Sequence, residues 1–385
     1  MQDCFMDTYH RLPVSFTKGE GVYLFDEQGK KYLDFSAGIA VNCLGHRHPA
    51  IMAALKKQSE KILHVCNYYN CDTSILFAQK LTAACKMKNV FLCNSGAEAN
   101  EGAIKIARKY SFKKYGAGRH TIVTLNGSFH GRTITTLSAT GQDCFHKDFG
   151  PFTEGFRFVT RGNSAELDAA LDNTVCALII EAVQGESGVN IQEKAFIKAA
   201  AELCAERDIL LIFDEVQCGM GRTGMFLGYE HFDVKPDIVT LAKALGGGIP
   251  CGAFLAGEKA CNVLESGDHG STFGGNPLAA ACGIAVLDTV NTKEFLAGIT
   301  ELGKFFTDKL KALKNPKITG IRNLGLMIAC DITIPSRSVL EKALANGLLL
   351  LSAGEKTLRF LPPYIISKAN IEEALNILDK TLNEL

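Results

Sequence analysis

Two charged residues, Asp214 and Lys243, offer the most specific chemistry in this sequence of 385 residues. Asp214 follows the apolar run 209–213, and Lys243 follows the apolar run 238–242. Such runs are typical of buried parallel strands, and ligands of such sheets bind beyond the carboxyl ends of the strands. Pyridoxal phosphate (PLP) requires both groups, because its aldehyde reacts with a lysine and its pyridine nitrogen pairs with an aspartate. The alternative is an ordinary surface ion pair.

A second segment, Asn94–Asn100, has the composition of a phosphate-binding helix start. It reads Asn-Ser-Gly-Ala-Glu-Ala-Asn and follows an apolar run. Small residues let backbone N–H groups approach an anion, Ser95 adds a hydroxyl, and the helix dipole favours negative charge. Taken alone, the segment fits a simple helix cap equally well.

The loop Gly127–Arg132 supplies an aromatic ring and a cation. Phe129 could stack on a flat ring, and Arg132 could hold a substrate carboxylate with two parallel hydrogen bonds. A turn with one buried aromatic residue and one solvated arginine remains the alternative. His130 lies between them and receives no predicted role.

Two carboxylates, Glu181 and Glu186, come directly after the predicted strand Cys176–Ile180. A buried carboxylate needs a cation, and Arg359 is the candidate partner. Such a pair is either structural or a gate, which opens when a substrate carboxylate competes for the arginine.

Two glycine-rich segments are less decisive. Residues 219–224 read Gly-Met-Gly-Arg-Thr-Gly and match the dinucleotide-binding fingerprint, which requires a helix at the third glycine. The following residues have turn character instead, so we reject a nicotinamide-dependent dehydrogenase. The loop His269–Pro277 offers the hydroxyls of Ser271 and Thr272 to a phosphate oxygen, or is a flexible connection.

The elements that position these residues follow an alternating pattern. Strands alternate with helices such as those predicted at 97–115 and 193–207, which indicates an α/β fold with a mostly parallel sheet covered by helices. We expect three parts: 1–48 as an N-terminal segment joining the small domain, 49–287 as a large PLP-binding domain, and 288–385 as a small α+β domain. The predicted strands are 90–93, 121–125, 176–180, 209–213, 238–241 and 251–255.

Composition excludes several kinds of partner. The chain has 41 basic and 41 acidic residues, so net charge gives no argument for binding nucleic acid or a membrane. Its start lacks the features of a signal peptide, and the cysteines are scattered without a Cys-x-x-Cys pair. We therefore expect a cytoplasmic protein without a metal site, acting on small molecules.

The combined motifs resemble the class III aminotransferases, a PLP-dependent family of fold type I. The similarity runs from Gly19 to Pro363, and the acetylornithine aminotransferase branch is the most similar. Ala182 departs from the usual proline of the family. The motifs that carry the resemblance are Ser95-Gly96, Phe129-x-x-Arg132, Asp214–Gln217, Lys243, and Ser271–Asn276, with 38–42, 214–224 and 347–354 typical of the branch.

The resemblance implies a role for each matching residue. Lys243 would bind the cofactor aldehyde and move the proton, while Asp214 would keep the ring nitrogen protonated. Arg132 would bind the α-carboxylate of the substrate, with Ser271 nearby. Glu186 would neutralise Arg359 in one half-reaction and release it in the other. The remaining cofactor-binding residues would be Ser95, Gly96 and Ala97 at the phosphate, Phe129 over the ring, Gln217 at the ring hydroxyl, Glu215, Val216, and Thr272 from a neighbouring subunit.

The resemblance also implies a reaction: transfer of the δ-amino group of N-acetyl-L-ornithine to 2-oxoglutarate by a homodimer, in arginine biosynthesis. Other ω-amino donors remain open, namely succinylornithine, ornithine, 4-aminobutyrate and N-succinyl-diaminopimelate. Residues near Val41, Asn67 and Tyr68 would distinguish them. An alternative of another class is a catalytically silent PLP-binding protein.

Overall fold

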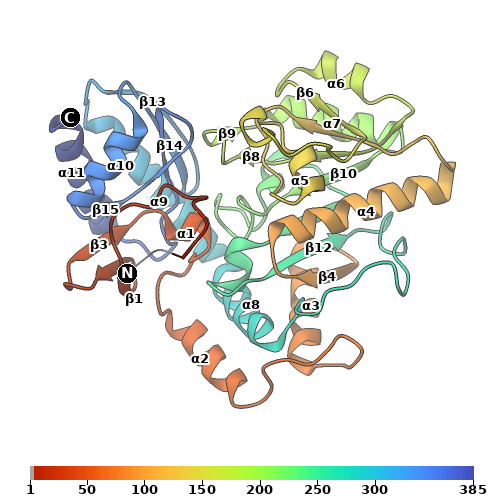
Figure 1. Cartoon of the computed structure of the whole chain (residues 1–385), viewed down its shortest axis with the longest axis horizontal. Coiled ribbons are helices and arrows are strands. Elements are labelled where there is room, and N and C mark those ends of the chain that lie inside the picture. Colours follow the sequence, from red (N-terminus) through yellow and green to blue (C-terminus); the bar gives the residue numbers. More distant parts are fainter. Residues whose placement is uncertain (1–3) are drawn as a thin grey trace.

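The computed structural model describes residues 4–385 and is built around a seven-stranded sheet (Figure 1). The strand order is β4-β12-β11-β10-β7-β5-β6. All six predicted strands are present within a residue or two of the expected positions. The strands are β4 (Asn89–Cys93), β5 (Thr121–Leu125), β6 (Phe156–Val159), β7 (Val175–Ile180), β10 (Leu210–Asp214), β11 (Ile238–Leu241) and β12 (Gly252–Ala256).

The predicted mostly parallel arrangement is confirmed, with two differences in detail. Strand β12 runs antiparallel to both of its neighbours, β11 and β4, whereas the other pairs are parallel. Strand β6 was not predicted. It forms the edge of the sheet, most of its residues are only half-buried, and Arg157 interrupts its apolar pattern.

Both faces of the sheet are buried, which explains the continuous apolar runs. Leu210 and Ile212 pack in a cluster with residues of α4 (Gly96–Tyr115). Leu211 and Phe213 point the other way and belong to the cluster that includes residues of α7 (Lys194–Glu206). A strand covered on both faces has no need for polar residues.

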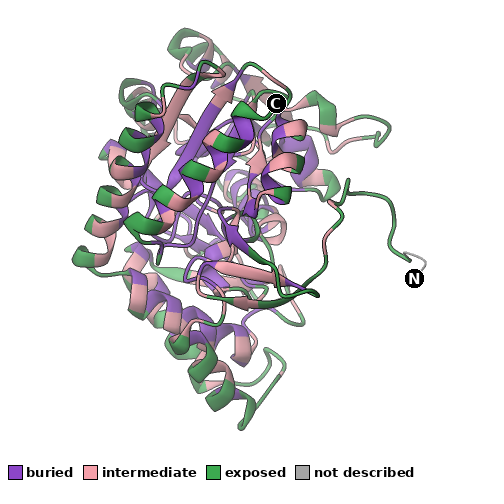
Figure 2. Cartoon of the chain, turned by 90° about the vertical axis from the view of Figure 1, so that its left-hand side faces the viewer, coloured by how far each residue is buried: buried purple, intermediate pink, exposed green. Residues whose placement is uncertain are grey.

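A second, antiparallel sheet is formed by the carboxyl-terminal part and lies to one side of the first (Figure 1). Its strand order is β13-β14-β17-β16. Its buried strands lie behind helices whose outer faces are exposed (Figure 2). The bounds are β13 (Ile318–Leu324), β14 (Met327–Ile332), β16 (Leu351–Ser352) and β17 (Thr357–Phe360), with α9 (Lys293–Ala312), α10 (Ser336–Ala345) and α11 (Lys368–Asn383).

The N-terminal strands join the carboxyl-terminal part through a third small sheet, because β3 pairs in parallel with β15. Helix α8 (Pro277–Val290) leads from the seven-stranded sheet to α9. The division into domains at 48/49 and 287/288 stays a prediction. The remaining elements are β1 (Phe16–Glu20), β2 (Tyr23–Asp26), β3 (Lys31–Asp34), β15 (Leu348–Leu349), the hairpin β8 (Val183–Gln184) and β9 (Asn190–Ile191), and the helices α1 (Ala37–Ala40), α2 (Pro49–Ser59), α3 (Asp72–Cys85), α5 (Ile134–Ala139) and α6 (Ser164–Ala170).

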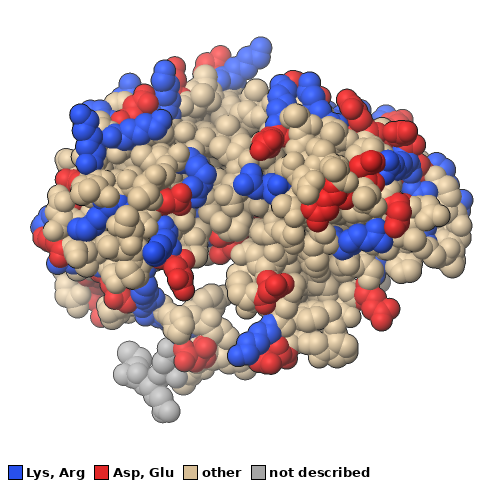
Figure 3. Space-filling view, turned by 90° about the horizontal axis from the view of Figure 1, so that it is seen from above, with Lys and Arg blue, Asp and Glu red and all other residues tan. Residues whose placement is uncertain are grey.

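The surface carries charges of both signs. Lys and Arg side chains are interspersed with Asp and Glu on the face shown in Figure 3, without a broad area of one sign. Among residues 4–385, no helix has the length and apolar character needed to cross a membrane.

Candidate active site

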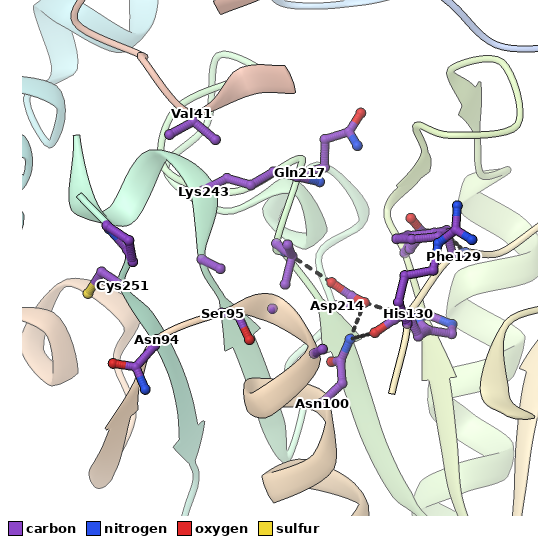
Figure 4. A pocket seen from close by; sticks show the side chains of 18 of the residues that line it. Val41, Asn94, Ser95, Asn100, Phe129, His130, Asp214, Gln217, Lys243 and Cys251 are labelled. Atoms are coloured by element: carbon purple, nitrogen blue, oxygen red, sulfur yellow. Dashed lines mark hydrogen bonds and ion pairs between the residues drawn. The ribbon is translucent and has the colours of Figure 1, made fainter. Parts of the chain in front are cut away.

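A cavity of about 440 Å³ lies at the carboxyl end of the seven-stranded sheet, and both Asp214 and Lys243 line it (Figure 4). Asp214 is the last residue of β10, and Lys243 lies two residues after the end of β11. The two strands are hydrogen-bonded neighbours. The structure therefore brings together the two residues on which the PLP prediction depends.

The carboxylate of Asp214 is held by three donors. Its Oδ1 accepts from the backbone N of Val216 at 3.0 Å, and its Oδ2 accepts from Asn100 Nδ2 at 2.8 Å. His130 Nδ1 lies 2.8 Å from the same Oδ2, and Asn100 also donates to the carbonyl of His130. Asp214 and His130 are both buried. Such a fixed carboxylate suits a single permanent partner.

His130 and Asn100 hold the Asp214 carboxylate, and sequence reasoning assigned this role to neither. His130 contacts an aspartate 84 positions away along the chain, so no local pattern indicated the pair. Asn100 ends the segment proposed for phosphate binding, but it lies one turn into α4 and points to Asp214 instead. The one available signal was that Asn100 is a polar residue on the helix face expected to be buried, where a polar side chain needs a hydrogen-bond partner.

Lys243 has a backbone conformation that is unfavourable for its residue type. Its φ is +47°, in the left-handed region that residues other than glycine rarely adopt. Such strain is often found at functional sites. Burial lowers the pKa of the Lys243 ammonium and the positive charge of Arg359 lowers it further, although Asp214 opposes the shift. Both effects favour the neutral amine, which is the nucleophilic form.

Ser95, Gly96 and Ala97 line the cavity at the start of the 20-residue helix α4. The Ser95 hydroxyl accepts from the backbone N of Glu98 at 3.2 Å and caps the helix. A Cβ at Gly96 would lie 2.7 Å from Val216 Cγ1, so the close packing requires glycine. A helix N-terminus with free N–H groups and small residues is suited to a phosphate.

The turn after β10 places only some of its residues in the cavity. Val216 and Gln217 line it. The carboxylate of Glu215 accepts instead from the backbone N atoms of Gly228 and Tyr229, at 2.7 and 2.8 Å. Burial raises the pKa of Glu215 to about 7. The side chain of Glu215 thus secures the turn and does not line the cavity, and its predicted contact with the cofactor stays a prediction.

Phe129 and Arg132 meet at the cavity as predicted. Both line it, and the Arg132 guanidinium lies 4.1 Å from the ring centre of Phe145 and 5.6 Å from that of Phe129. No carboxylate within residues 4–385 pairs with Arg132. Its charge is therefore held by aromatic rings and is available to an anionic ligand.

Arg359 and Glu186 form the predicted ion pair. Arg359 Nη1 lies 2.8 Å from Glu186 Oε2, and it also donates to the carbonyl of Gly185 at 2.8 Å. A longer contact of 3.4 Å links the same atom to Gln217 Oε1, at the edge of the cavity. The Arg359 side chain is 2 % exposed, whereas that of Glu186 is 32 % exposed.

Glu181 also lines the cavity, but Arg359, considered as a partner for both carboxylates, pairs with Glu186 and not with Glu181. It is buried and accepts from the backbone N of Phe129 at 3.2 Å. Burial, together with the negative charge of Asp214, raises the pKa of Glu181 well above its usual value. The burial therefore favours the protonated carboxyl group more than it would at an exposed glutamate.

Ser271 and Thr272 do not reach this cavity within the single chain. They line a separate hollow of about 1020 Å³, together with Asn67 and Tyr68. The Ser271 hydroxyl accepts from Asn94 Nδ2 at 3.2 Å. Their predicted contacts with cofactor and substrate stay predictions, and for Thr272 the prediction already required a second subunit.

The residues of the cavity fit PLP. They comprise a lysine, a fixed carboxylate, a helix start suited to phosphate and an aromatic ring. Among residues 4–385 we find no group of three or more His, Cys, Asp or Glu arranged to hold a metal ion.

Comparison with known proteins decides the family. The model of the family "Aminotransferase class-III" matches residues 5–382. This chain belongs to the class III aminotransferases. Acetylornithine aminotransferase of Caldanaerobacter subterraneus is 49% identical over 383 residues, covering 99% of this chain and 97% of that protein. Acetylornithine aminotransferase of Methanocaldococcus jannaschii is 44% identical, covering 99% and 96%.

Solved structures give the same fold. Ornithine aminotransferase of Toxoplasma gondii superposes with a TM-score of 0.94 at 35% identity, covering 99% of this chain and 93% of that one. N-acetylornithine aminotransferase of Stenotrophomonas maltophilia gives 0.86 at 35% identity, covering 98% and 97%. A further structure of the Toxoplasma enzyme shows partial occupancy of PLP at its active site. The predicted family, fold, enzyme class and cofactor are confirmed.

Proposed function

We propose that this aminotransferase transfers the δ-amino group of N-acetyl-L-ornithine to 2-oxoglutarate, giving N-acetyl-L-glutamate 5-semialdehyde and L-glutamate. The observation that carries the proposal is a pair of arginines in different states near one cavity. Arg132 has no carboxylate partner among residues 4–385, whereas Arg359 is covered by Glu186. Relatives named acetylornithine aminotransferase, 49% and 44% identical over nearly the whole chain, support it.

PLP, when bound, supplies a ring that accepts electrons from the substrate carbon. Ser95, Gly96 and Ala97 would hold its phosphate, Phe129 would cover its ring and Asp214 would pair with its ring nitrogen. Gln217 would contact the ring hydroxyl. The Lys243 amine would move the proton, with Nζ as the base that takes it from the substrate carbon.

The two half-reactions use the arginines differently. Acetylornithine places its α-carboxylate on Arg132 and brings no carboxylate to Arg359, which stays paired with Glu186. Glutamate reacts through its α-amine, so its α-carboxylate needs Arg359 while Arg132 takes the side-chain carboxylate. Because the Glu186 side chain is partly exposed, its carboxylate can separate from Arg359 and be solvated by water, so it does not become an unpaired buried charge.

A homodimer completes this site in our proposal. Thr272 of one subunit would reach the phosphate bound by the other. Exposed aromatic residues near Thr272 support a contact surface there, since Tyr68 is 94% and Phe273 62% exposed. Sedimentation equilibrium should give a dimer at assay concentrations, and a monomer with full activity would contradict the shared site.

Ornithine is the strongest competing donor, because the Toxoplasma relative with a TM-score of 0.94 is an ornithine aminotransferase. Steady-state comparison of acetylornithine, succinylornithine, ornithine, N-succinyl-diaminopimelate and 4-aminobutyrate tests the choice. We expect acetylornithine to lead in kcat/KM by about tenfold or more, or about 1.4 kcal/mol. A tie with ornithine or 4-aminobutyrate would contradict the assignment but not the aminotransferase class.

A cytoplasmic location is part of the proposal. Every cysteine from Cys43 onward is a free thiol, as expected in a reducing compartment. A silent PLP-binding protein is the alternative of another class. It predicts a visible cofactor absorbance band that acetylornithine does not change, whereas an aminotransferase loses the band on mixing.

A further inference from the structure

Arg222 is a buried cation whose charge the proposed reaction does not use. It stands in the glycine-rich segment 219–224 that follows the cofactor-binding turn, and its side chain is 0% exposed. No carboxylate of residues 4–385 pairs with it, and its Nε and Nη2 have no acceptor there. Burying an arginine without a counter-charge destabilises a fold, so the presence of one at this position calls for another explanation.

The contacts that Arg222 makes are directed at the carboxyl-terminal sheet. Its Nη1 donates to the carbonyl of Leu326 at 3.1 Å and to that of Pro362 at 2.7 Å. The guanidinium carbon lies 4.4 Å from the ring centre of Tyr364. One nitrogen thus binds two segments that are distant in sequence, and an aromatic ring supports it.

Those two segments flank the strand pair that contains Arg359: β17 includes it, and β14 pairs with β17. Leu326 directly precedes β14, and Pro362 follows β17 by two residues. The strands pair antiparallel, with Ala329 opposite Arg359. Arg222 therefore holds the beginning of β14 and the end of β17 together at one point, three residues from Arg359.

The backbone reinforces this attachment. The N–H of Leu326 donates to the carbonyl of Arg222 at 3.0 Å. A Cβ on Gly325 would lie 2.5 Å from the carbonyl carbon of Thr223 and 2.7 Å from the carbonyl oxygen of Arg222, so only glycine fits between the segments.

The segment that contains Arg222 also contacts Arg359 directly, through a residue nearer to β10. Gln217, five residues before Arg222, accepts from Arg359 Nη1 at 3.4 Å. Segment 217–222 thus touches the Arg359 guanidinium through Gln217 and fixes its strand through Arg222. A displaced β17 would move Arg359 relative to Glu186, Gly185 and the cavity, while leaving Arg132 on its own loop.

We propose that Arg222 is a positioning residue that fixes β17, so that Arg359 reaches Glu186 in one half-reaction and a substrate carboxylate in the other. The inference rests on the proposed function, because it assumes that glutamate needs Arg359 and acetylornithine does not. It predicts that weakening the contacts of Arg222 impairs the binding of glutamate more than the binding of acetylornithine.

The test compares the holoenzyme with the variants Arg222→Lys, Arg359→Lys and the double variant. Each half-reaction is followed separately, through the cofactor absorbance, with glutamate or acetylornithine as the only donor. We expect Arg222→Lys to raise the apparent dissociation constant of glutamate about tenfold and that of acetylornithine less than about twofold. In the Arg359→Lys background, Arg222→Lys should add little, because the guanidinium that it positions is gone.

A second variant keeps the test decisive if Arg222→Lys does not fold. Tyr364→Leu removes the ring beneath Arg222 but leaves its charge, and should weaken glutamate binding selectively, by about threefold. If Arg222→Lys or Tyr364→Leu weakens the binding of both donors equally while Arg359→Lys weakens only that of glutamate, this inference is overturned and the proposed function stands. An Arg359→Lys variant that binds glutamate normally would overturn the proposed gate, and this inference with it.

Discussion

Asp214 and Arg359 are both buried charges near one cavity, but the structure holds them in different ways. Asp214 is bound by Asn100, His130 and the backbone of Val216, all in fixed elements. Arg359 is bound by two neutral oxygens and by the partly exposed carboxylate of Glu186. The fixed charge suits a permanent partner, the cofactor ring. The exchangeable charge suits substrates that alternate between half-reactions.

The largest expected effect comes from removing the fixed charge. Asp214→Asn keeps the shape but cannot stabilise a protonated ring nitrogen, so kcat should fall about 10³-fold or more with both donors. Steady-state kinetics measure it. Asp288→Asn, which removes an exposed carboxylate, should stay within about twofold. A fall in kcat with only one of the two donors would contradict the assignment of Asp214 to a partner that is shared by both half-reactions.

A smaller effect should follow from loosening the donors around Asp214. His130→Phe removes one hydrogen bond to a buried carboxylate, which is worth about 1.5–3 kcal/mol. We therefore expect a roughly tenfold to hundredfold fall in kcat, with the preference between acetylornithine and glutamate unchanged. An unchanged kcat would show that two donors are sufficient to fix Asp214.

Changing the exchangeable charge should alter preference rather than rate. Glu186→Ala leaves Arg359 uncovered, so the ratio of kcat/KM values should shift about tenfold towards glutamate. The matched control is Glu202→Ala on the exposed face of α7, for which no shift is expected. An unchanged ratio in Glu186→Ala would rule out the gate.

The last prediction concerns stability rather than catalysis, at Glu215, a buried acid that pairs with no cation within residues 4–385. Burial raises its pKa from 4.5 to about 7, so the folded protein favours its protonated form. Its contribution to stability is fully present below pH 4.5 and is lost as the pH rises to about 7. The free energy of unfolding of Glu215→Gln should therefore fall less than that of the wild type between pH 5 and pH 8, by about 1–3 kcal/mol. Urea unfolding at several pH values measures it, and parallel pH profiles would contradict it.

The same comparison explains what could be predicted from the sequence. Lys243, Asp214 and Ser95–Ala97 follow strands whose apolar runs are continuous, and the ends of neighbouring strands meet at one edge of a sheet. The strands, the helices between them and the cavity were therefore accessible to pattern analysis. Arg359 was predicted as the cation for the two carboxylates after β7, but the requirement of a buried carboxylate did not choose between them: the partly exposed Glu186 pairs with Arg359, and the buried Glu181 accepts from the backbone of Phe129.

The rest depends on contacts that no local pattern encodes. The bond between His130 and Asp214 spans 84 positions, and the direction of β12 depends on its neighbours rather than on its own residues. Glu215 looked equivalent to its neighbours in the turn, yet its carboxylate points to the backbone of Gly228. Arg222 read as part of a nucleotide-binding motif, and only the tertiary structure shows that it holds two strands of another sheet.

The most direct test of the central claim identifies the lysine that carries the cofactor. Reduction of the holoenzyme with borohydride fixes PLP to that lysine, and digestion followed by mass spectrometry locates it. The account predicts the label on Lys243, opposite Asp214, in nearly all molecules. A label on any other lysine, or an active enzyme whose Lys243 remains unlabelled, would contradict it.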